Sequence, residues 1–191
     1  MSGLPHGWLL LKNLSNSATW CVIPGAQGAS GTVARVPSVP YIPAMLDDIY
    51  NKRILEFAGS IPSLGRLAAP DASATAHSRL CGSTVTVDLK MDGDVVSDFS
   101  HEVKACALGQ ASSSIMAQHV VGANAAELRG VRDAMFKMLK ENGPAPEGRF
   151  GDLKFLEPVR DYKARHASTM LTFDAVIDAV GQIEAKRAAA G

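Results

Sequence analysis

Acidic residues are missing from the first 44 positions of this 191-residue chain, and this is its most uneven feature. Lys12 and Arg35 are the only charged side chains there, and prolines interrupt the segment at five places. No helical or alternating apolar period joins its two tryptophans, Trp8 and Trp20. We therefore predict that residues 1–44 form a poorly ordered N-terminal extension, with Met45 as an alternative start, and that residues 45–191 form the folded domain.

Long apolar runs, net charge and cysteine are also scarce. The longest apolar run, residues 8–11, is far short of the roughly 20 residues that span a bilayer. The 19 basic and 19 acidic residues give a formal net charge of zero, so the chain has no overall field to hold a nucleic acid. Three cysteines are too few, and odd in number, for a disulfide framework. We expect a cytoplasmic protein rather than one of an organellar matrix, with no nucleic-acid or membrane partner.

The strongest local pattern is a β-hairpin between the second and third cysteines. In residues 84–91 every second side chain is apolar, as in a strand with one buried face. Asp92-Gly93 is a pair typical of a type I′ turn, and the alternation resumes over residues 95–105. Cys81 and Cys106 therefore flank the hairpin at its open end.

Helical patterns precede and follow this hairpin. Apolar spacing predicts a short helix after Met45 that ends at Gly59, and the small residues 72–76 predict a loop leading to Cys81. Beyond the hairpin we predict helices over residues 107–121, 125–140 and 169–189, with a short helical or turn segment over 150–158. Strands gathered early and helices late indicate an α+β fold, with a small antiparallel sheet covered on one face by helices.

The two cysteines beside the hairpin are the candidate chemical groups. Adjacent strands lie about 4.8 Å apart, so Cys81 and Cys106 could meet and share a metal ion or a cluster. Gly82 permits close backbone approach, and Cys106 lies where a helix begins, so that free N–H groups stabilise its thiolate. The alternative is that both are small buried apolar residues, which is common for free cysteine. No Cys-His-Asp set is close enough in sequence to indicate a hydrolase.

Three blocks of the sequence form a recognisable pattern. They are Cys81-Gly82-Ser83, Asp92-Gly93-Asp94, and the most specific block, residues 105–116, which contains Ala105-Cys106-Ala107 and Ser112-Ser113-Ser114. These blocks resemble the NifU/IscU/SufU family of iron–sulfur cluster assembly scaffolds, and they are closest to its SufU-like branch. Residues 151–173 resemble the C-terminal pattern of the SufU-like branch. The resemblance covers residues 45–180 and implies a SufE/NifU-like α+β fold.

The resemblance also implies a ligand set of three cysteines and one aspartate. Cys81 and Cys106 match two of the cysteines, whereas Ser83 stands at the aspartate position and Ser168 at the third cysteine position. Hydroxyls are poor ligands for iron or zinc compared with thiolates and carboxylates. His166, two residues before Ser168, is a candidate replacement ligand if that segment is extended, and otherwise a solvated or hydrogen-bonded histidine.

The function that the resemblance implies is a scaffold that takes sulfur from a cysteine desulfurase, binds iron and sulfide transiently and passes the cluster, most often 2Fe–2S, to acceptor or carrier proteins. Such a protein is not an enzyme. Two alternatives stay open. One is a zinc-dependent sulfurtransferase that partners a cysteine desulfurase, with Cys106 as a possible sulfur acceptor. The other is a degenerate member that binds partners without metal. Because one chain offers two thiolates, a homodimer could complete a four-thiolate set.

Overall fold

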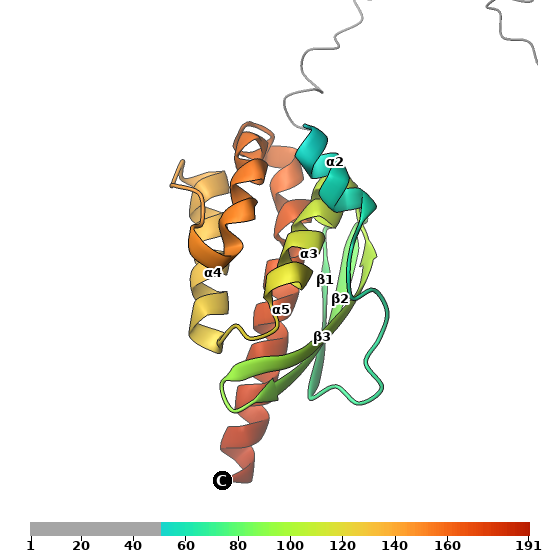
Figure 1. The fold of residues 1–191 in the computed structure, drawn as a ribbon, viewed down its shortest axis with the longest axis vertical. Coiled ribbons are helices and arrows are strands. Elements are labelled where there is room, and N and C mark those ends of the chain that lie inside the picture. Colours follow the sequence, from blue (N-terminus) through green and yellow to red (C-terminus); the bar gives the residue numbers. More distant parts are fainter. Residues whose placement is uncertain (1–50) are drawn as a thin grey trace, which may run out of the picture. The chain divides into compact units, whose positions relative to one another are not determined.

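The computed structural model describes residues 51–191, which fold as one sheet with helices on one face (Figure 1). In chain order the elements are α2 (Lys52–Gly59), β1 (Ala72–His77), β2 (Thr84–Asp92), β3 (Val95–Lys104), α3 (Ala107–His119), α4 (Ala125–Lys140), the 3-10 segment η1 (Gly148–Asp161) and α5 (Lys163–Ala190). The predicted extension over residues 1–44 and the start of the predicted first helix lie outside the described residues.

The predicted hairpin is confirmed as β2 and β3. Both pair antiparallel, with Leu89 opposite Phe99, and β2 is the central strand of the order β1-β2-β3. The predicted turn is wrong by one residue, because Asp92 pairs with Val95 and leaves Gly93-Asp94 as the central pair. Of these two, only Gly93 has a positive φ, 56°. A type I′ turn needs a positive φ at both positions, so the turn is of another type.

Residues 72–76, predicted as a loop, belong to the edge strand β1. This strand pairs antiparallel with β2 over its whole length. Ala72 and Ala74 are buried, whereas Ser73 and Thr75 are exposed. The two-residue period is therefore present, but small side chains carry it, and a search for large alternating apolar residues misses it. These alanines leave room for α5, which packs on β1 and β2.

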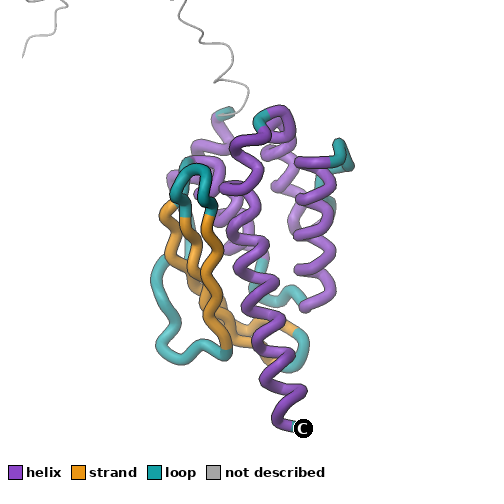
Figure 2. Tube along the Cα trace, turned by 180° about the vertical axis from the view of Figure 1, so that it is seen from behind, coloured by secondary structure: helices purple, strands orange, loops and turns teal. Residues whose placement is uncertain are grey.

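Helices α3 and α5 cover one face of the sheet, and α4 with η1 forms a further layer outside them (Figures 1 and 2). The core contains fully buried side chains from the sheet and from the helices that cover it, among them Val87 and Leu89 of β2, Ile115 of α3 and Phe173 of α5. The predicted α+β class, with a small antiparallel sheet covered on one face, is confirmed. None of the helices in residues 51–191 is both long and apolar enough to cross a membrane.

The helix bounds agree with the prediction for α4 and differ elsewhere. Helix α3 ends at His119, two residues earlier than predicted, and η1 extends the predicted short segment at both ends. The largest difference is α5, which begins at Lys163 instead of at residue 169. The first two turns of α5 therefore include His166 and Ser168, both of which the sequence analysis had considered as members of an extended segment.

Candidate functional site

Cys81 lies in the loop that joins β1 to β2, at the end of the sheet opposite the β2–β3 turn (Figure 2). The backbone closes this loop, because the Ser78 amide donates to the Ser83 carbonyl at 2.9 Å and the Gly82 amide donates to the Ser78 carbonyl at 2.9 Å. Gly82 has a φ of +69°, a left-handed conformation that glycine adopts without strain. The loop therefore holds a solvent-exposed cysteine in a fixed position.

Serine hydroxyls surround the Cys81 thiol. Its Sγ atom lies 3.0 Å from Ser83 Oγ and 3.2 Å from Ser78 Oγ. Both serines are buried, although the cysteine between them is exposed. A third hydroxyl, that of Ser168 in α5, also interacts with Cys81. We refer to Ser78, Ser83 and Ser168 as the serine cluster.

The serine cluster lowers the pKa of Cys81 to about 7. The hydrogen bond with the Ser78 hydroxyl is the largest cause, and the Ser83 hydroxyl is the next. Partial burial opposes the change, while the Ser83 backbone amide and the Ser168 hydroxyl add to it. Donors of this kind stabilise a thiolate over a thiol. Cys81 is therefore ionised at a lower pH than an ordinary cysteine.

Cys106 occupies the N-cap position of α3, in extended backbone conformation. Its Sγ atom lies 3.5 Å from Ser168 Oγ, and the side chain is half-buried. No side chain caps the first turn of α3, and the Cys106 side chain makes no hydrogen bond with the free amide groups of that turn. Because Ser168 interacts with Cys81 as well as Cys106, the two predicted cysteines and both predicted serine positions meet at one place.

A glycine brings α3 against α5 beside these thiols. A Cβ atom at Gly109 would lie 2.7 Å from the Ala105 Cβ and 3.0 Å from the Ser168 carbonyl oxygen, both shorter than normal contacts allow. Gly109 therefore permits the approach of the two helices that places Ser168 next to Cys106. Gly109 is therefore part of the site although it has no reactive side chain.

His166 lies apart from the serine cluster. Successive residues of an α-helix turn by about 100°, so His166 and Ser168, two positions apart in α5, point to different sides. The imidazole Nε2 lies 2.9 Å from the Arg160 carbonyl oxygen and 3.1 Å from that of Val159. The condition for its role as a ligand, an extended segment, is therefore not met. In this structure His166 fixes the end of η1 to α5.

Ser78 is the site residue that the sequence analysis missed. The signal that could have found it is local: a serine three residues before a cysteine, in a short loop closed by glycine, places the hydroxyl beside the thiol. Neither propensity nor apolar periodicity detects such a contact. The loop is a hairpin connection because residues 72–77 form β1, and the sequence pattern predicted a loop over residues 72–76 instead.

The donor set of this site does not fit a resident zinc ion. Within residues 51–191, no three side chains of the His, Cys, Asp and Glu types come close enough to hold a metal ion. The site offers two thiols and three hydroxyls, whereas structural zinc takes four strong ligands. One chain therefore supplies half of such a set.

Comparison with known proteins identifies the family of this chain. Residues 49–169 match the family model described as NifU-like N terminal domain. The iron-sulfur cluster assembly scaffold protein IscU of Thermotoga maritima is 25% identical over 135 residues, 71% of this chain and 94% of that protein. The zinc-dependent sulfurtransferase SufU of Bacillus subtilis is 24% identical over 141 residues, 74% of this chain and 95% of that protein.

Solved structures show the same likeness. The N-terminal part of a nitrogen-fixing NifU-like protein from Brucella abortus is 73% identical, with a TM-score of 0.74, over 75% of this chain and 99% of that chain. A putative scaffold protein for the SUF system from Fervidobacterium islandicum shares the fold at 22% identity, with a TM-score of 0.65, over 70% of this chain and 98% of that one. The chain therefore belongs to the family of NifU-like N-terminal domains, which includes the iron–sulfur cluster assembly scaffolds.

Proposed function

We propose that this protein is a scaffold for iron–sulfur cluster assembly, which accepts sulfur from a cysteine desulfurase and holds iron and sulfide between Cys81 and Cys106. It then passes the cluster to acceptor proteins. The observation that carries the proposal is the placement of both cysteines beside Ser168, with the pKa of Cys81 lowered to about 7. The names of the IscU relatives support the same function.

The small ligand number suits a protein that gives its cluster away. A 2Fe–2S cluster takes four protein ligands, and one chain supplies the thiolates of Cys81 and Cys106. Binding to a single chain is therefore weak and the cluster easily released. A second copy of the chain could supply two further thiolates across a symmetric interface. The dimer would then bind the cluster more tightly than a single chain does.

Cys81 is the thiol suited to receive sulfur. Its thiolate attacks the outer sulfur of a desulfurase persulfide; a new S–S bond forms on Cys81, the desulfurase S–S bond breaks, and the desulfurase cysteine leaves as a thiolate. The reaction needs an exposed nucleophile that is ionised near pH 7. Cys81 has both properties.

A second candidate function is sulfur transfer without cluster assembly. The exposure and the low pKa of Cys81 favour it, because a sulfurtransferase needs one reactive thiol and no iron. The name of the Bacillus subtilis relative supports this class. We do not extend the zinc dependence in that name to a single copy of this chain, because its two thiolates do not make a zinc site.

Anaerobic reconstitution separates the two functions. The full chain is incubated with a cysteine desulfurase, ferrous iron and excess free cysteine. Two cysteine thiols supply the two electrons that convert persulfide sulfur to sulfide and are oxidised to cystine. Visible absorption spectra, metal and sulfide analysis, and mass spectrometry of the cysteines follow. A scaffold yields iron and sulfide in equal amounts on the protein. A sulfurtransferase yields a persulfide on Cys81 whether or not iron is present, and no iron-coupled sulfide.

The third cysteine provides the matched control. Cys81→Ser and Cys106→Ser should each abolish the absorption of the cluster, whereas Cys21→Ser should leave it unchanged, because Cys21 lies outside the matched residues 49–169. If the protein binds neither iron nor sulfur under these conditions, both functions are refuted. The remaining interpretation is then a degenerate family member that binds partners without metal.

A further inference from the structure

A cavity lies next to the loop that carries Cys81. Its volume is about 680 Å³, within the range of small-molecule sites. It is bounded by the end of α4, the end of η1, the start of α5 and Leu80 of the loop. Leu80, which is 78% exposed, directly precedes Cys81. Ala167 of α5, which directly precedes Ser168, also lines the cavity, so two of the lining residues are sequence neighbours of site residues.

The charged groups of this cavity are mostly basic. Lys140, Arg160 and Lys163 line it, against one carboxylate, Asp161. In residues 51–191 neither lysine has a carboxylate within salt-bridge distance. Two lysine charges without a paired carboxylate favour a ligand that carries negative charge.

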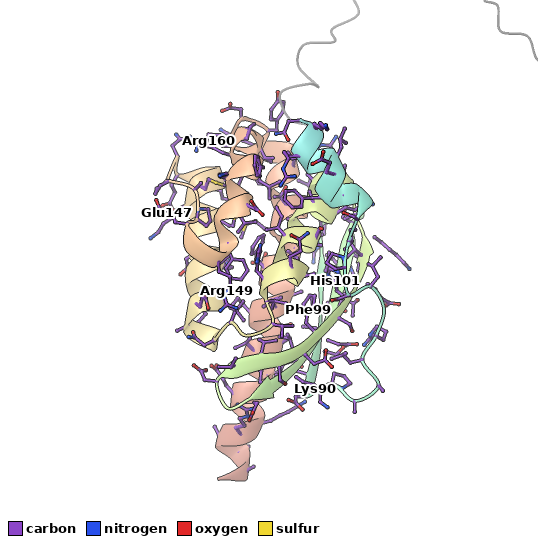
Figure 3. All side chains as sticks on the ribbon, in the orientation of Figure 1. Lys90, Phe99, His101, Glu147, Arg149 and Arg160 are labelled. Atoms are coloured by element: carbon purple, nitrogen blue, oxygen red, sulfur yellow. The ribbon has the colours of Figure 1, made fainter. Side chains whose placement is uncertain are left out.

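Arg160 adds a third positive charge to the cavity. Its Nη2 atom donates to the Glu157 carboxylate at 2.6 Å, which offsets part of that charge. Figure 3 shows this arginine at the end of the molecule where η1 meets α5. The two lysines are therefore the charges that a bound anion would meet first.

We propose that this cavity binds an anionic low-molecular-weight disulfide, a carboxylate-bearing molecule of about tripeptide size, and that Cys81 undergoes thiol–disulfide exchange with it. The inference goes beyond the proposed function, since it needs neither iron nor a desulfurase. The lysines bind the carboxylates, Leu80 covers the apolar part, and a molecule of this length reaches from the cavity to the adjoining thiol.

The exchange is balanced in atoms and electrons. The Cys81 thiolate attacks one sulfur of the bound disulfide, a bond forms between the two sulfur atoms, and the S–S bond of the small molecule breaks. The other half leaves as a thiolate with the bonding electron pair. Cys81 is thereby oxidised to a mixed disulfide while the small molecule is reduced, and the reverse reaction with the free thiol restores Cys81.

Two disulfides of opposite charge test the proposal. The full chain with Cys21→Ser is incubated at low ionic strength with glutathione disulfide, which is anionic, or with cystamine, which is cationic, and the mixed disulfide at Cys81 is followed by peptide mass spectrometry. Lys140→Ala combined with Lys163→Ala should slow the reaction with glutathione disulfide by about 5- to 10-fold and should not slow the reaction with cystamine. Alkylation by neutral iodoacetamide should stay unchanged and so show an intact thiol.

A matched pair of lysines outside the cavity controls for net charge. Lys90 lies at the end of the molecule away from Arg160 (Figure 3), and Lys186 lies near the end of α5. Lys90→Ala combined with Lys186→Ala removes the same charge and should change neither rate by as much as 2-fold. Equal loss of rate in both double variants, no loss in the cavity variant, or a mixed disulfide formed at Cys106 instead of Cys81 would overturn the proposal.

Discussion

The two cysteines of the site lie close together and yet in different environments. Cys81 is exposed on a loop between two strands, and its Sγ atom donates to two hydroxyls, those of Ser78 and Ser83. Cys106 is half-buried at the start of a helix and has one hydroxyl neighbour, Ser168. The difference indicates a division of tasks, in which Cys81 meets incoming reagents and Cys106 provides a second sulfur atom in a fixed position.

Completing the ligand set should have the largest effect on this pair. Ser83→Asp together with Ser168→Cys adds a carboxylate beside Cys81 and a thiolate between both cysteines, where hydroxyls now lie. We expect the affinity of a single chain for zinc or ferrous iron to rise about 100-fold or more, measured by competition with a metal chelator. Unchanged affinity would show that these serines do not stand at ligand positions.

Separating the two helices beside the thiols should have the next largest effect. Gly109→Ala places a methyl group 2.7 Å from the Ala105 Cβ and 3.0 Å from the Ser168 carbonyl oxygen. We expect a loss of about 1–3 kcal/mol in the free energy of unfolding, measured by chemical denaturation. Gly130→Ala in α4 is the matched control, because its Cβ would meet nothing within 4 Å and alanine favours helix. Equal stability of the two variants would contradict the tight contact.

Removing the hydroxyl of Ser78 should make the two cysteines more alike. Ser78→Ala deletes the strongest donor to the Cys81 thiolate, so the pKa of Cys81 should rise from about 7 toward 8. The rate of alkylation at pH 7 should then fall about 5-fold, while the rate at pH 10, where the thiol is ionised in both proteins, should stay the same. Ser78→Thr keeps a hydroxyl and serves as the control. A pH profile of alkylation at Cys81 that does not move would exclude this hydroxyl as the cause.

Replacement of His166 should have the smallest effect at the thiols. His166→Ala removes the contacts with the Val159 and Arg160 carbonyls, so the free energy of unfolding should fall by about 1–3 kcal/mol. Metal affinity and the alkylation rates of both cysteines should not change. The control is Asn124→Ala, which removes the N-cap of α4 at the other end of the sheet. A loss of metal affinity larger than the loss seen with this control would identify His166 as a ligand.

The sequence predicts the parts of this fold that rest on strong periodicity. The alternation of large apolar residues identified β2 and β3, and the amphipathic pattern identified α4 over its observed bounds. The strand β1 was not predicted, because Ala72 and Ala74 are too small to mark a buried face. The start of α5 was not predicted, because its first residues, from Lys163, are mostly polar and their helical state depends on packing against η1.

The same limit applies to the site. The positions of Cys81 and Cys106 followed from the hairpin between them, and those of Ser83 and Ser168 from the family resemblance. The contacts of Ser78 and Gly109 could not be predicted, because they depend on how one loop closes and on how closely two helices approach. Such distances are properties of tertiary packing, which no local pattern records.

The serine cluster has one further consequence, which concerns the charge that this end of the molecule tolerates. A hydroxyl both donates and accepts hydrogen bonds and reorients by rotation about a single bond, whereas a carboxylate only accepts. When Cys81 is protonated, the Ser83 hydroxyl can accept a hydrogen bond from the thiol, and when Cys81 is ionised, the same hydroxyl can donate a hydrogen bond to the thiolate. The sulfur atom can therefore gain and lose a full negative charge while the surrounding backbone stays in place and no polar group is left unpaired.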